Sequence, residues 1–146
     1  MKRPHRHARP AQTPSGARKG TGFAAPMEQE LDVTAMGARG DATAESEFGL
    51  IYVPFALPGE RVRARVIGDR ADLAQIMTPS PERQAPACRH FGRCGGCQLQ
   101  HWAEGAYLGW KREQVVQALA RRGMGGARVD ATLPAWGLGR RHERCR

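Results

Sequence analysis

Three of the four cysteines fall within ten residues, and they are the part of this sequence best suited to chemistry. Cys88, Cys94 and Cys97 follow a C-x5-C-x2-C spacing, with Gly95 and Gly96 between the last two. No export signal precedes them, so we expect a reducing, cytoplasmic compartment in which structural disulfides are rare. Glycine permits positive φ and lets a loop wrap around bound sulfur ligands. The pattern therefore predicts a metal site formed by these three cysteines.

The spacing alone leaves the metal open. Zinc requires a fourth ligand, and His101 follows Cys97 closely while His90 lies inside the loop, so a Cys3His zinc site is one candidate. An iron–sulfur cluster also takes four ligands, usually all cysteine. The only other cysteine is Cys145, in a terminal segment that has no clear element to hold it.

The charge of the chain favours a polyanionic partner. The 146 residues carry 23 Lys and Arg against 14 Asp and Glu, a net charge of +9. Residues 1–26 hold six cations and no acid, residues 27–80 hold five cations and nine acids, and residues 81–146 hold twelve cations and five acids. Basic side chains bind phosphates and release counterions, so RNA is a natural partner, although the same charge also serves solubility. No apolar run is long enough to cross a bilayer, and we expect no membrane partner.

Residues 27–80 must position whatever binds there, and their pattern is that of a small barrel. Apolar residues alternate with polar ones near 31–35, 50–55, 61–67 and 71–77, and Gly or Pro turns separate these runs. Four short strands of this kind predict a meander that closes into a barrel. Tyr52 and Phe48 are candidates for base stacking, whereas Phe55 is expected in the core.

One strand of this region carries a row of arginines. Arg61, Arg63 and Arg65 occupy alternate positions and so share one face of a strand, at roughly 6–7 Å intervals that suit successive phosphates. The competing interpretation is a solvated face paired with acids of a neighbouring strand, because this segment is acidic overall. Both interpretations stand at this point.

Beyond the cysteines, residues 102–123 predict one helix that ends at Arg121, Arg122 and Gly123. We expect its aromatic residues to pack beside the cysteine loop rather than contact RNA; these are Trp102, Tyr107 and Trp110. Residues 129–133 could begin the first strand of a further domain.

Several motifs in succession resemble one enzyme family. They are Pro58-Gly59-Glu60, Ser80-Pro81-Glu82-Arg83, Pro86-Ala87-Cys88 and Phe91-Gly92-Arg93-Cys94-Gly95-Gly96-Cys97-Gln98-Leu99-Gln100-His101. Over about residues 28–136 the sequence is similar to the N-terminal part of the TRAM-domain RNA (uracil-5-)methyltransferases. The large-subunit rRNA uracil methyltransferases that carry a [4Fe-4S] cluster are the most similar branch.

The resemblance implies a domain plan and a set of ligands. Residues 1–26 would be a disordered basic tail, 27–80 an OB-like TRAM barrel that binds RNA, 81–101 the iron–sulfur loop, 102–123 a helix and 124–146 the incomplete start of a central domain. Cys88, Cys94 and Cys97 match the first three cluster ligands, and His101 matches a position that is not a ligand. The fourth ligand of the family lies further downstream than Cys145, so Cys145 is not assigned that role.

The catalytic residues of the family and its S-adenosylmethionine site lie in a domain that this sequence does not contain. We therefore expect no catalytic and no SAM-binding residue here, and a truncated reading frame would explain the missing domain. The expected function is that of an rRNA-binding N-terminal fragment of a uracil-C5 methyltransferase, with a separately encoded catalytic half as a candidate partner. The alternatives are a zinc-binding RNA adaptor and a non-functional truncated product.

Overall fold

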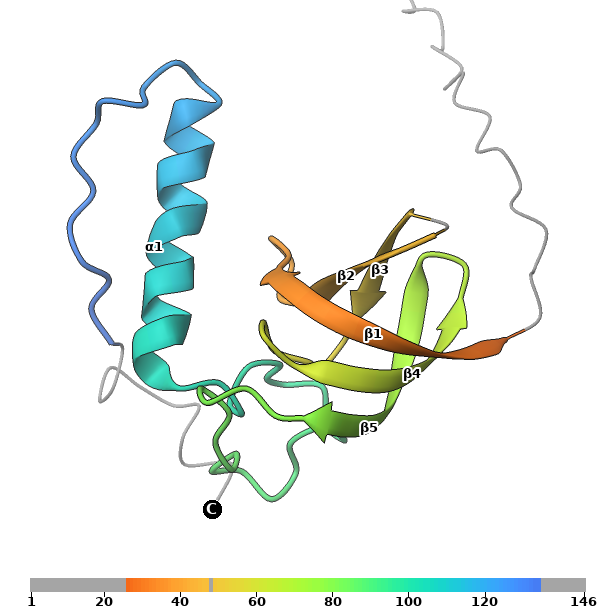
Figure 1. Ribbon diagram of the computed structural model, residues 1–146. Helices are drawn as coiled ribbons and strands as arrows, with labels where there is room; N and C mark the ends of the chain where they lie inside the picture. The colour runs from red at the N-terminus through yellow and green to blue at the C-terminus, as the bar shows by residue number, and fades with distance from the viewer. Residues whose placement is uncertain (1–25, 48, 135–146) are drawn as a thin grey trace, which may run out of the picture.

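A closed five-stranded barrel, a long loop and one helix follow one another along the chain (Figure 1). The computed structural model describes residues 26–47 and 49–134. Predictions for the N-terminal tail, for Phe48 and for Cys145 lie outside these residues. The strands are β1 (Met27–Met36), β2 (Ala42–Ser46), β3 (Gly49–Val53), β4 (Arg61–Ile67) and β5 (Arg70–Thr78), and the helix is α1 (Glu104–Ala120).

The strands are arranged in the order β1-β2-β3-β5-β4, and β4 pairs back onto β1 to close the barrel. All the pairings are antiparallel except that between β3 and β5, which is parallel. This parallel contact has one residue pair in register, Tyr52 with Arg70, and the Tyr52 N–H also donates to the Asp69 carbonyl at 2.8 Å. We call this contact between β3 and β5 the seam of the barrel.

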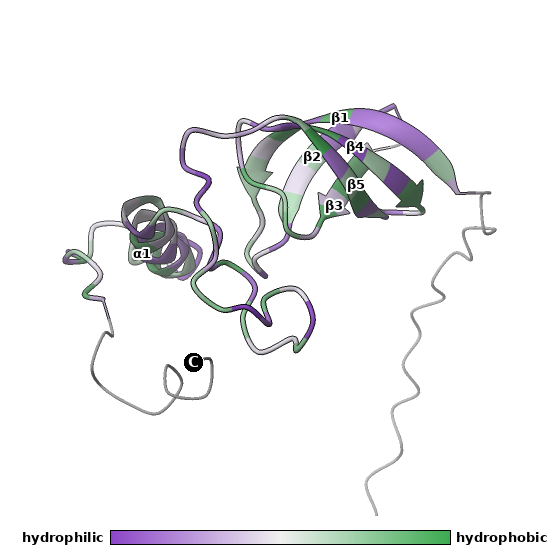
Figure 2. Ribbon diagram, turned by 90° about the horizontal axis from the view of Figure 1, so that it is seen from below, coloured by the Kyte–Doolittle hydropathy of each residue, from purple (hydrophilic) through white to green (hydrophobic). Residues whose placement is uncertain are grey.

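The core of the barrel is built from small and medium apolar side chains, because the interior of a five-stranded barrel is narrow. It contains Leu31, Val33, Ala42, Ala44, Ile51, Val53, Ala56, Val62, Ala64 and Ala71, each less than 5% exposed. These residues alternate with polar ones along the strands, as the hydropathy colouring in Figure 2 shows. Period-two burial of this kind is what the sequence predicted for this region.

The predicted fold class is confirmed, but two details of the prediction are wrong. The sequence indicated four strands, whereas a fifth, β2, lies where only a turn and its surroundings were expected. The order of strands is also not that of a meander, since β5 lies between β3 and β4. Ala42 and Ala44 hid β2, because alanine has weak strand propensity, yet both side chains are fully buried.

Helix α1 is shorter than predicted at both ends. It begins at Glu104 because Trp102 and Ala103 are paired with the segment around Arg83 instead. It ends where Gly123 takes φ +77° and the Met124 N–H donates back to the Leu119 carbonyl at 2.9 Å. The strand expected at 129–133 does not form, since residues 127–134 have no regular structure. Arg112 instead donates to the Val129 carbonyl at 2.8 Å, and the segment runs back beside α1 (Figure 1).

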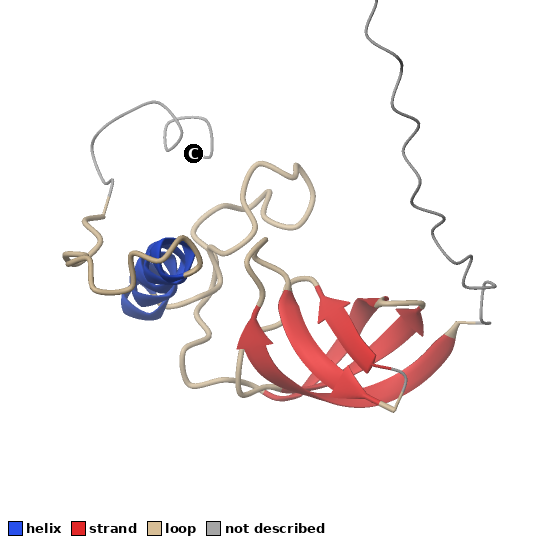
Figure 3. Ribbon diagram, turned by 90° about the horizontal axis from the view of Figure 1, so that it is seen from above, coloured by secondary structure: helices blue, strands red, loops and turns tan. Residues whose placement is uncertain are grey.

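The loop between β5 and α1 connects the barrel to the helix and lies between them (Figure 3). It carries all three cysteines of the predicted metal site and is fastened at both ends by backbone pairing. The Gln84 N–H donates to the His101 carbonyl at 2.9 Å, and the Ala103 N–H donates to the Glu82 carbonyl at 2.8 Å. The two ends of the loop therefore lie side by side, and the residues between them form a closed loop outside the barrel.

Candidate metal centre and nucleic-acid interface

A buried ion pair fixes the start of the cysteine loop to the barrel. Glu60, in the turn before β4, is 1% exposed, and its carboxylate accepts hydrogen bonds from Arg83 through both oxygens. The same carboxylate accepts the backbone N–H groups of Leu57 at 2.9 Å and Ser80 at 3.2 Å. Burial raises the pKa of Glu60, but the Arg83 and backbone donors outweigh it and hold the pKa below its usual value.

Arg83 also reaches the second attachment point of the loop. Its guanidinium donates to the Phe55 carbonyl at 2.8 Å. Phe55 is the only described non-glycine residue with positive φ, at +65°, a conformation that stores backbone strain. Its ring is 38% exposed and packs edge-on against Phe91 of the cysteine loop at 5.5 Å. The expectation that Phe55 belongs to the barrel core is therefore wrong, because the strained turn directs its ring outward onto the loop.

His101 completes this aromatic contact. It is 1% exposed, and its ring lies 5.2 Å from that of Phe91 and 6.3 Å from that of Phe55. The backbone of Phe55 and Ala56 interacts with the imidazole and favours its charged form, but this effect is outweighed. Burial and the nearby Arg83 charge lower the pKa of His101 to about 4. His101 is thus a buried residue whose uncharged form is favoured, and it packs against the two phenylalanine rings.

The three cysteines differ in exposure but lie near one another. Cys88 is 3% exposed, Cys97 is half-buried and Cys94 is exposed. Burial and the nearby charges of Cys88 and Cys94 raise the pKa of the Cys97 thiol. A bound cation would reverse this effect, since it favours the thiolate form.

Hydrogen-bond donors already surround the sulfur atoms. The Gln100 side-chain amide bridges two of the cysteines, because its Oε1 accepts the Cys88 N–H at 3.1 Å and its Nε2 donates to Cys97 Sγ at 3.1 Å. The His90 N–H points at Cys88 Sγ at 3.4 Å. Gly95 takes φ +68° between the last two cysteines, as the sequence led us to expect of a glycine there.

The three cysteines lie on one loop, but their side chains do not form a complete set of metal ligands among the described residues. Within residues 26–47 and 49–134, no three His, Cys, Asp or Glu side chains form a group able to hold a metal ion. The donor set nevertheless suits a thiolate-bound centre, since the sulfurs share one loop, receive N–H donors and are turned by a glycine.

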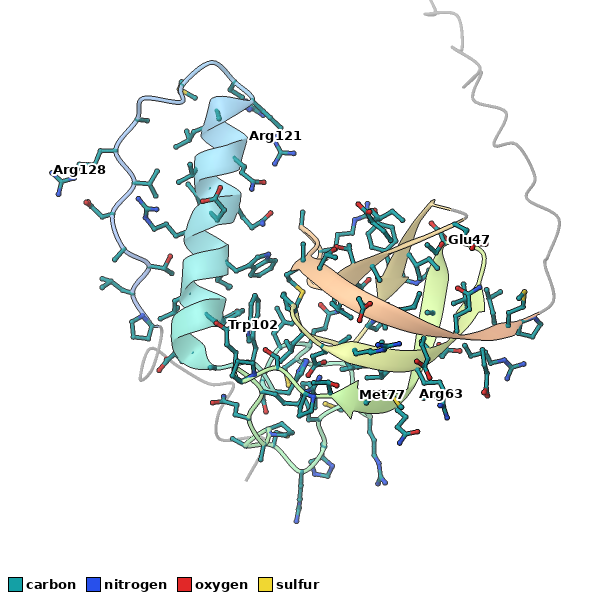
Figure 4. The ribbon with its side chains drawn as sticks, in the orientation of Figure 1. Glu47, Arg63, Met77, Trp102, Arg121 and Arg128 are labelled. Atoms are coloured by element: carbon teal, nitrogen blue, oxygen red, sulfur yellow. The ribbon has the colours of Figure 1, made fainter. Side chains whose placement is uncertain are left out.

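The arginine row lies on the outside of the barrel as predicted. Arg61, Arg63 and Arg65 alternate with buried Val62 and Ala64 along β4. Figure 4 shows Arg63 directed away from the barrel. The interpretation as a solvated face paired with acids is supported, because Glu30 of the neighbouring strand β1 pairs with two of the arginines. Contact with RNA phosphates stays a prediction.

A single carboxylate holds two members of the row. Glu30 accepts from Arg61 at 3.1 Å and from Arg63 at 3.3 Å, and these hydrogen bonds lower the pKa of Glu30. Arg65 makes no ion pair with any other described residue. All of these groups are exposed, so the pairs are weak and screened by salt.

The aromatic residues near α1 pack together, as expected. Trp102 is 5% exposed, and its Nε1 donates to Glu82 at 2.9 Å. The Trp110 ring lies 6.0 Å from that of Trp102 and stacks on Tyr107 at 6.1 Å.

The described part of the chain contains no helix long and apolar enough to cross a membrane.

Sequence reasoning assigned no role to Glu60, Arg83 or Gln100, although all three lie in the motifs that carried the family resemblance. Glu60 and Arg83 are separated by more than twenty residues, and nothing in their local patterns indicates that they meet. Gln100 follows Cys97 at a helical spacing of three, which is the one signal that could have revealed its contact with that sulfur.

Comparison with known proteins identifies relatives but no matching family model. The chain is 52% identical over 97 residues to an RNA methyltransferase of Caulobacter vibrioides, an alignment that covers 66% of this chain and 23% of the relative. An RNA methyltransferase of Brucella suis is also 52% identical, over 95 residues, covering 65% of this chain and 23% of the relative. The 23S rRNA (uracil(1939)-C(5))-methyltransferase RlmD of Halomonas elongata is 39% identical over 102 residues, covering 66% of this chain and 21% of its own. Over about two thirds of its length the chain is therefore similar to proteins named RNA methyltransferases, and it spans about a quarter of their length.

Proposed function

We propose that this chain is the RNA-binding and cluster-bearing portion of an rRNA uracil-C5 methyltransferase that uses S-adenosylmethionine. The observation that carries the proposal is the 52% identity to an RNA methyltransferase over 97 residues, which are 66% of this chain. The chain matches less than a quarter of those relatives, so methyl transfer would depend on protein beyond the matched part.

The barrel would contact RNA through the outer face of β4. Glu30 holds Arg61 and Arg63 with their guanidinium groups in one row with Arg65. Exposed ion pairs of this kind exchange readily, so an RNA phosphate could replace the Glu30 carboxylate as the partner of either arginine. Binding would then release counterions and weaken as salt is added.

The cysteine loop would hold an iron–sulfur cluster through Cys88, Cys94 and Cys97. A bound cluster would cross-link three points of a loop that is held at its ends by backbone pairing and at Phe91 by ring contacts. Gln100 would donate its amide to the Cys97 sulfur, and the His90 N–H would donate to that of Cys88, as N–H groups commonly do around clusters. Cys145, the remaining cysteine, lies outside the described residues.

The RNA proposal is tested by binding of an rRNA fragment at several salt concentrations. Replacing Arg61, Arg63 and Arg65 with Ser should weaken binding. The slope of the logarithm of the binding constant against the logarithm of the salt concentration should also fall, by the equivalent of up to about three phosphate contacts. The matched control replaces Arg121, Arg122 and Arg128 with Ser, which removes the same charge from the far side of the molecule, where Figure 4 shows two of these side chains. Equal losses in both variants, or none in the first, would assign the affinity to general charge or to the basic tail.

The cluster proposal is tested on protein purified without oxygen. Brown protein that contains iron and acid-labile sulfide supports it, and replacing Cys88 with Ser should remove both. Colourless protein with stoichiometric zinc would contradict it and favour a zinc-binding adaptor.

A further inference from the structure

Helix α1 has no buried residue, although it is 17 residues long. A helix of this length is only marginally stable in water by itself, because most helical stability in proteins comes from packing of an apolar face. Figure 1 shows α1 standing apart from the barrel, and contacts with the barrel are few compared with those among the strands. Something further is therefore needed to stabilise α1.

One side of α1 is suited to receive a partner. Leu108, Val115 and Leu119 occur at positions i, i+7 and i+11, which places them on one face of a helix. We call these three residues the α1 stripe. Val115 is 49% exposed, and the other two are only partly buried. The segment after the helix adds Met124, 47% exposed, and Leu133, 84% exposed.

The internal contacts of α1 leave the centre of this stripe, Val115, exposed. Trp110 and Tyr107 stack on one another, and Trp110 also contacts Trp102 at the base of the helix. Successive residues turn by about 100° in a helix, so this aromatic cluster is centred well away from the stripe. The returning segment is joined to α1 by the hydrogen bond from Arg112 to the Val129 carbonyl, yet Val115 remains exposed.

We propose that the α1 stripe is the docking surface for the portion of the methyltransferase that the relatives contain and this chain does not match. This inference rests on the proposed function. The matched part is 23% of the Caulobacter relative, so in that protein the matched part adjoins more than three times its own length of further polypeptide. An aliphatic stripe fits the apolar surface of such a domain.

The chemistry of the stripe favours this occupant over RNA. Nucleic acid is recognised by cations and by aromatic rings free to stack, whereas the three stripe residues are aliphatic. The rings nearest to them are already engaged with one another, and Lys111 lies over the Tyr107 ring at 4.9 Å. An exposed apolar surface on a helix is instead typical of a contact with protein.

The test compares the isolated chain with a chimera in which the full chain replaces the matched region of the Caulobacter relative. Hydrogen exchange of the amides of residues 104–120 is measured in both proteins. These amides should exchange at least about tenfold more slowly in the chimera, because the stripe is then covered. Val115→Lys should abolish this gain, whereas Gln117→Lys, which adds the same charge at an exposed position of the opposite face, should retain it.

Measurements on the isolated chain guard against a chimera that fails to fold. Val115→Lys should leave its melting temperature and helical circular dichroism nearly unchanged, because Val115 is exposed among the residues that the structure describes. A fall in either would show that the stripe packs internally, which would overturn the proposal. So would slow exchange of α1 in the isolated chain, a concentration-dependent dimer lost in Val115→Lys, or protection of α1 by RNA alone. None of these outcomes alters the binding measured for the arginine row, so failure here is distinct from failure of the proposed function.

Discussion

The Glu60 carboxylate and the Arg83 guanidinium form a two-pronged ion pair that joins the barrel to the start of the cysteine loop. The pair is nearly closed to solvent, with side-chain exposures of 0% for Glu60 and 22% for Arg83. Every contact that Arg83 makes through its guanidinium ends on the turn 55–60, either on Glu60 or on the Phe55 carbonyl. This pair is therefore a main determinant of the position of the cysteine loop relative to the barrel, together with the ring contact between Phe55 and Phe91.

Removing one partner of this pair should destabilise the protein strongly. Glu60→Ala leaves the Arg83 charge largely buried and strips acceptors from the Leu57 and Ser80 N–H groups, so we expect a loss on the order of 3 kcal/mol in the free energy of unfolding. Urea unfolding measures it. The matched control is Glu30→Gln, which also loses two arginine contacts but at an exposed site. Similar unfolding midpoints for the two variants would contradict the structural role of Glu60.

Acid should destabilise the protein in a window set by His101. Its pKa falls from 6.5 in the unfolded chain to about 4 in the folded protein. Between these two pKa values the unfolded chain binds a proton that the folded protein does not bind. The free energy of unfolding therefore falls as the pH drops from 6.5 toward 4, and at about pH 5 the loss is about 2 kcal/mol. His101→Leu should flatten the curve in this range.

Glu60 acts in the same direction at lower pH. Because its folded pKa lies below the ordinary 4.5, its contribution is present above 4.5 and disappears as the pH falls through the lowered value. The two groups are separated by measuring unfolding free energies across both windows. A stability that rises on acidification below pH 6.5 would contradict the buried, neutral state of His101.

At Phe55, the glycine variant should be more stable than the alanine variant, which is the reverse of the usual order. Both Phe55→Ala and Phe55→Gly lose the ring contact with Phe91, but only glycine relieves the strain of φ +65°. Phe55→Gly should therefore be more stable than Phe55→Ala by about 1 kcal/mol in thermal or urea unfolding. At the neighbouring Ala56, where φ is not positive, replacement by glycine should destabilise in the ordinary way.

Gln100 should tune the proposed metal centre. Gln100→Glu replaces the donor to Cys97 Sγ with a negative charge, which repels thiolates, so iron retained per chain after anaerobic reconstitution should fall several-fold. Gln98→Glu adds the same charge where the side chain lies beside Gly40 of the β1–β2 turn rather than a sulfur. Equal iron contents in the two variants would show that the Gln100 amide does not support the site.

Features that depend on neighbouring residues in the sequence could be predicted from sequence patterns. Alternation along β4 correctly indicated the buried Val62 and Ala64 and the outward arginines, and Gly123 correctly marked the end of α1. The resemblance is confirmed by the relatives. What could not be predicted depends on residues distant in sequence: the insertion of β5 beside β3, and the buried pairing of Glu60 with Arg83. Charged residues are normally exposed, so no pattern identifies one that is buried.

The seam between β3 and β5 determines how the barrel can yield. A single residue pair in register closes it, whereas every other junction has three or more. Outside the backbone, it is reinforced by the exposed contact from Arg70 to Asp41. Thermal fluctuations should therefore break the pairing between β3 and β5 first. The barrel then becomes a curved open sheet, and the other four strand pairings persist. Because β4 keeps its pairings with β1 and β5 when this junction opens, the arginine row would remain on an intact sheet.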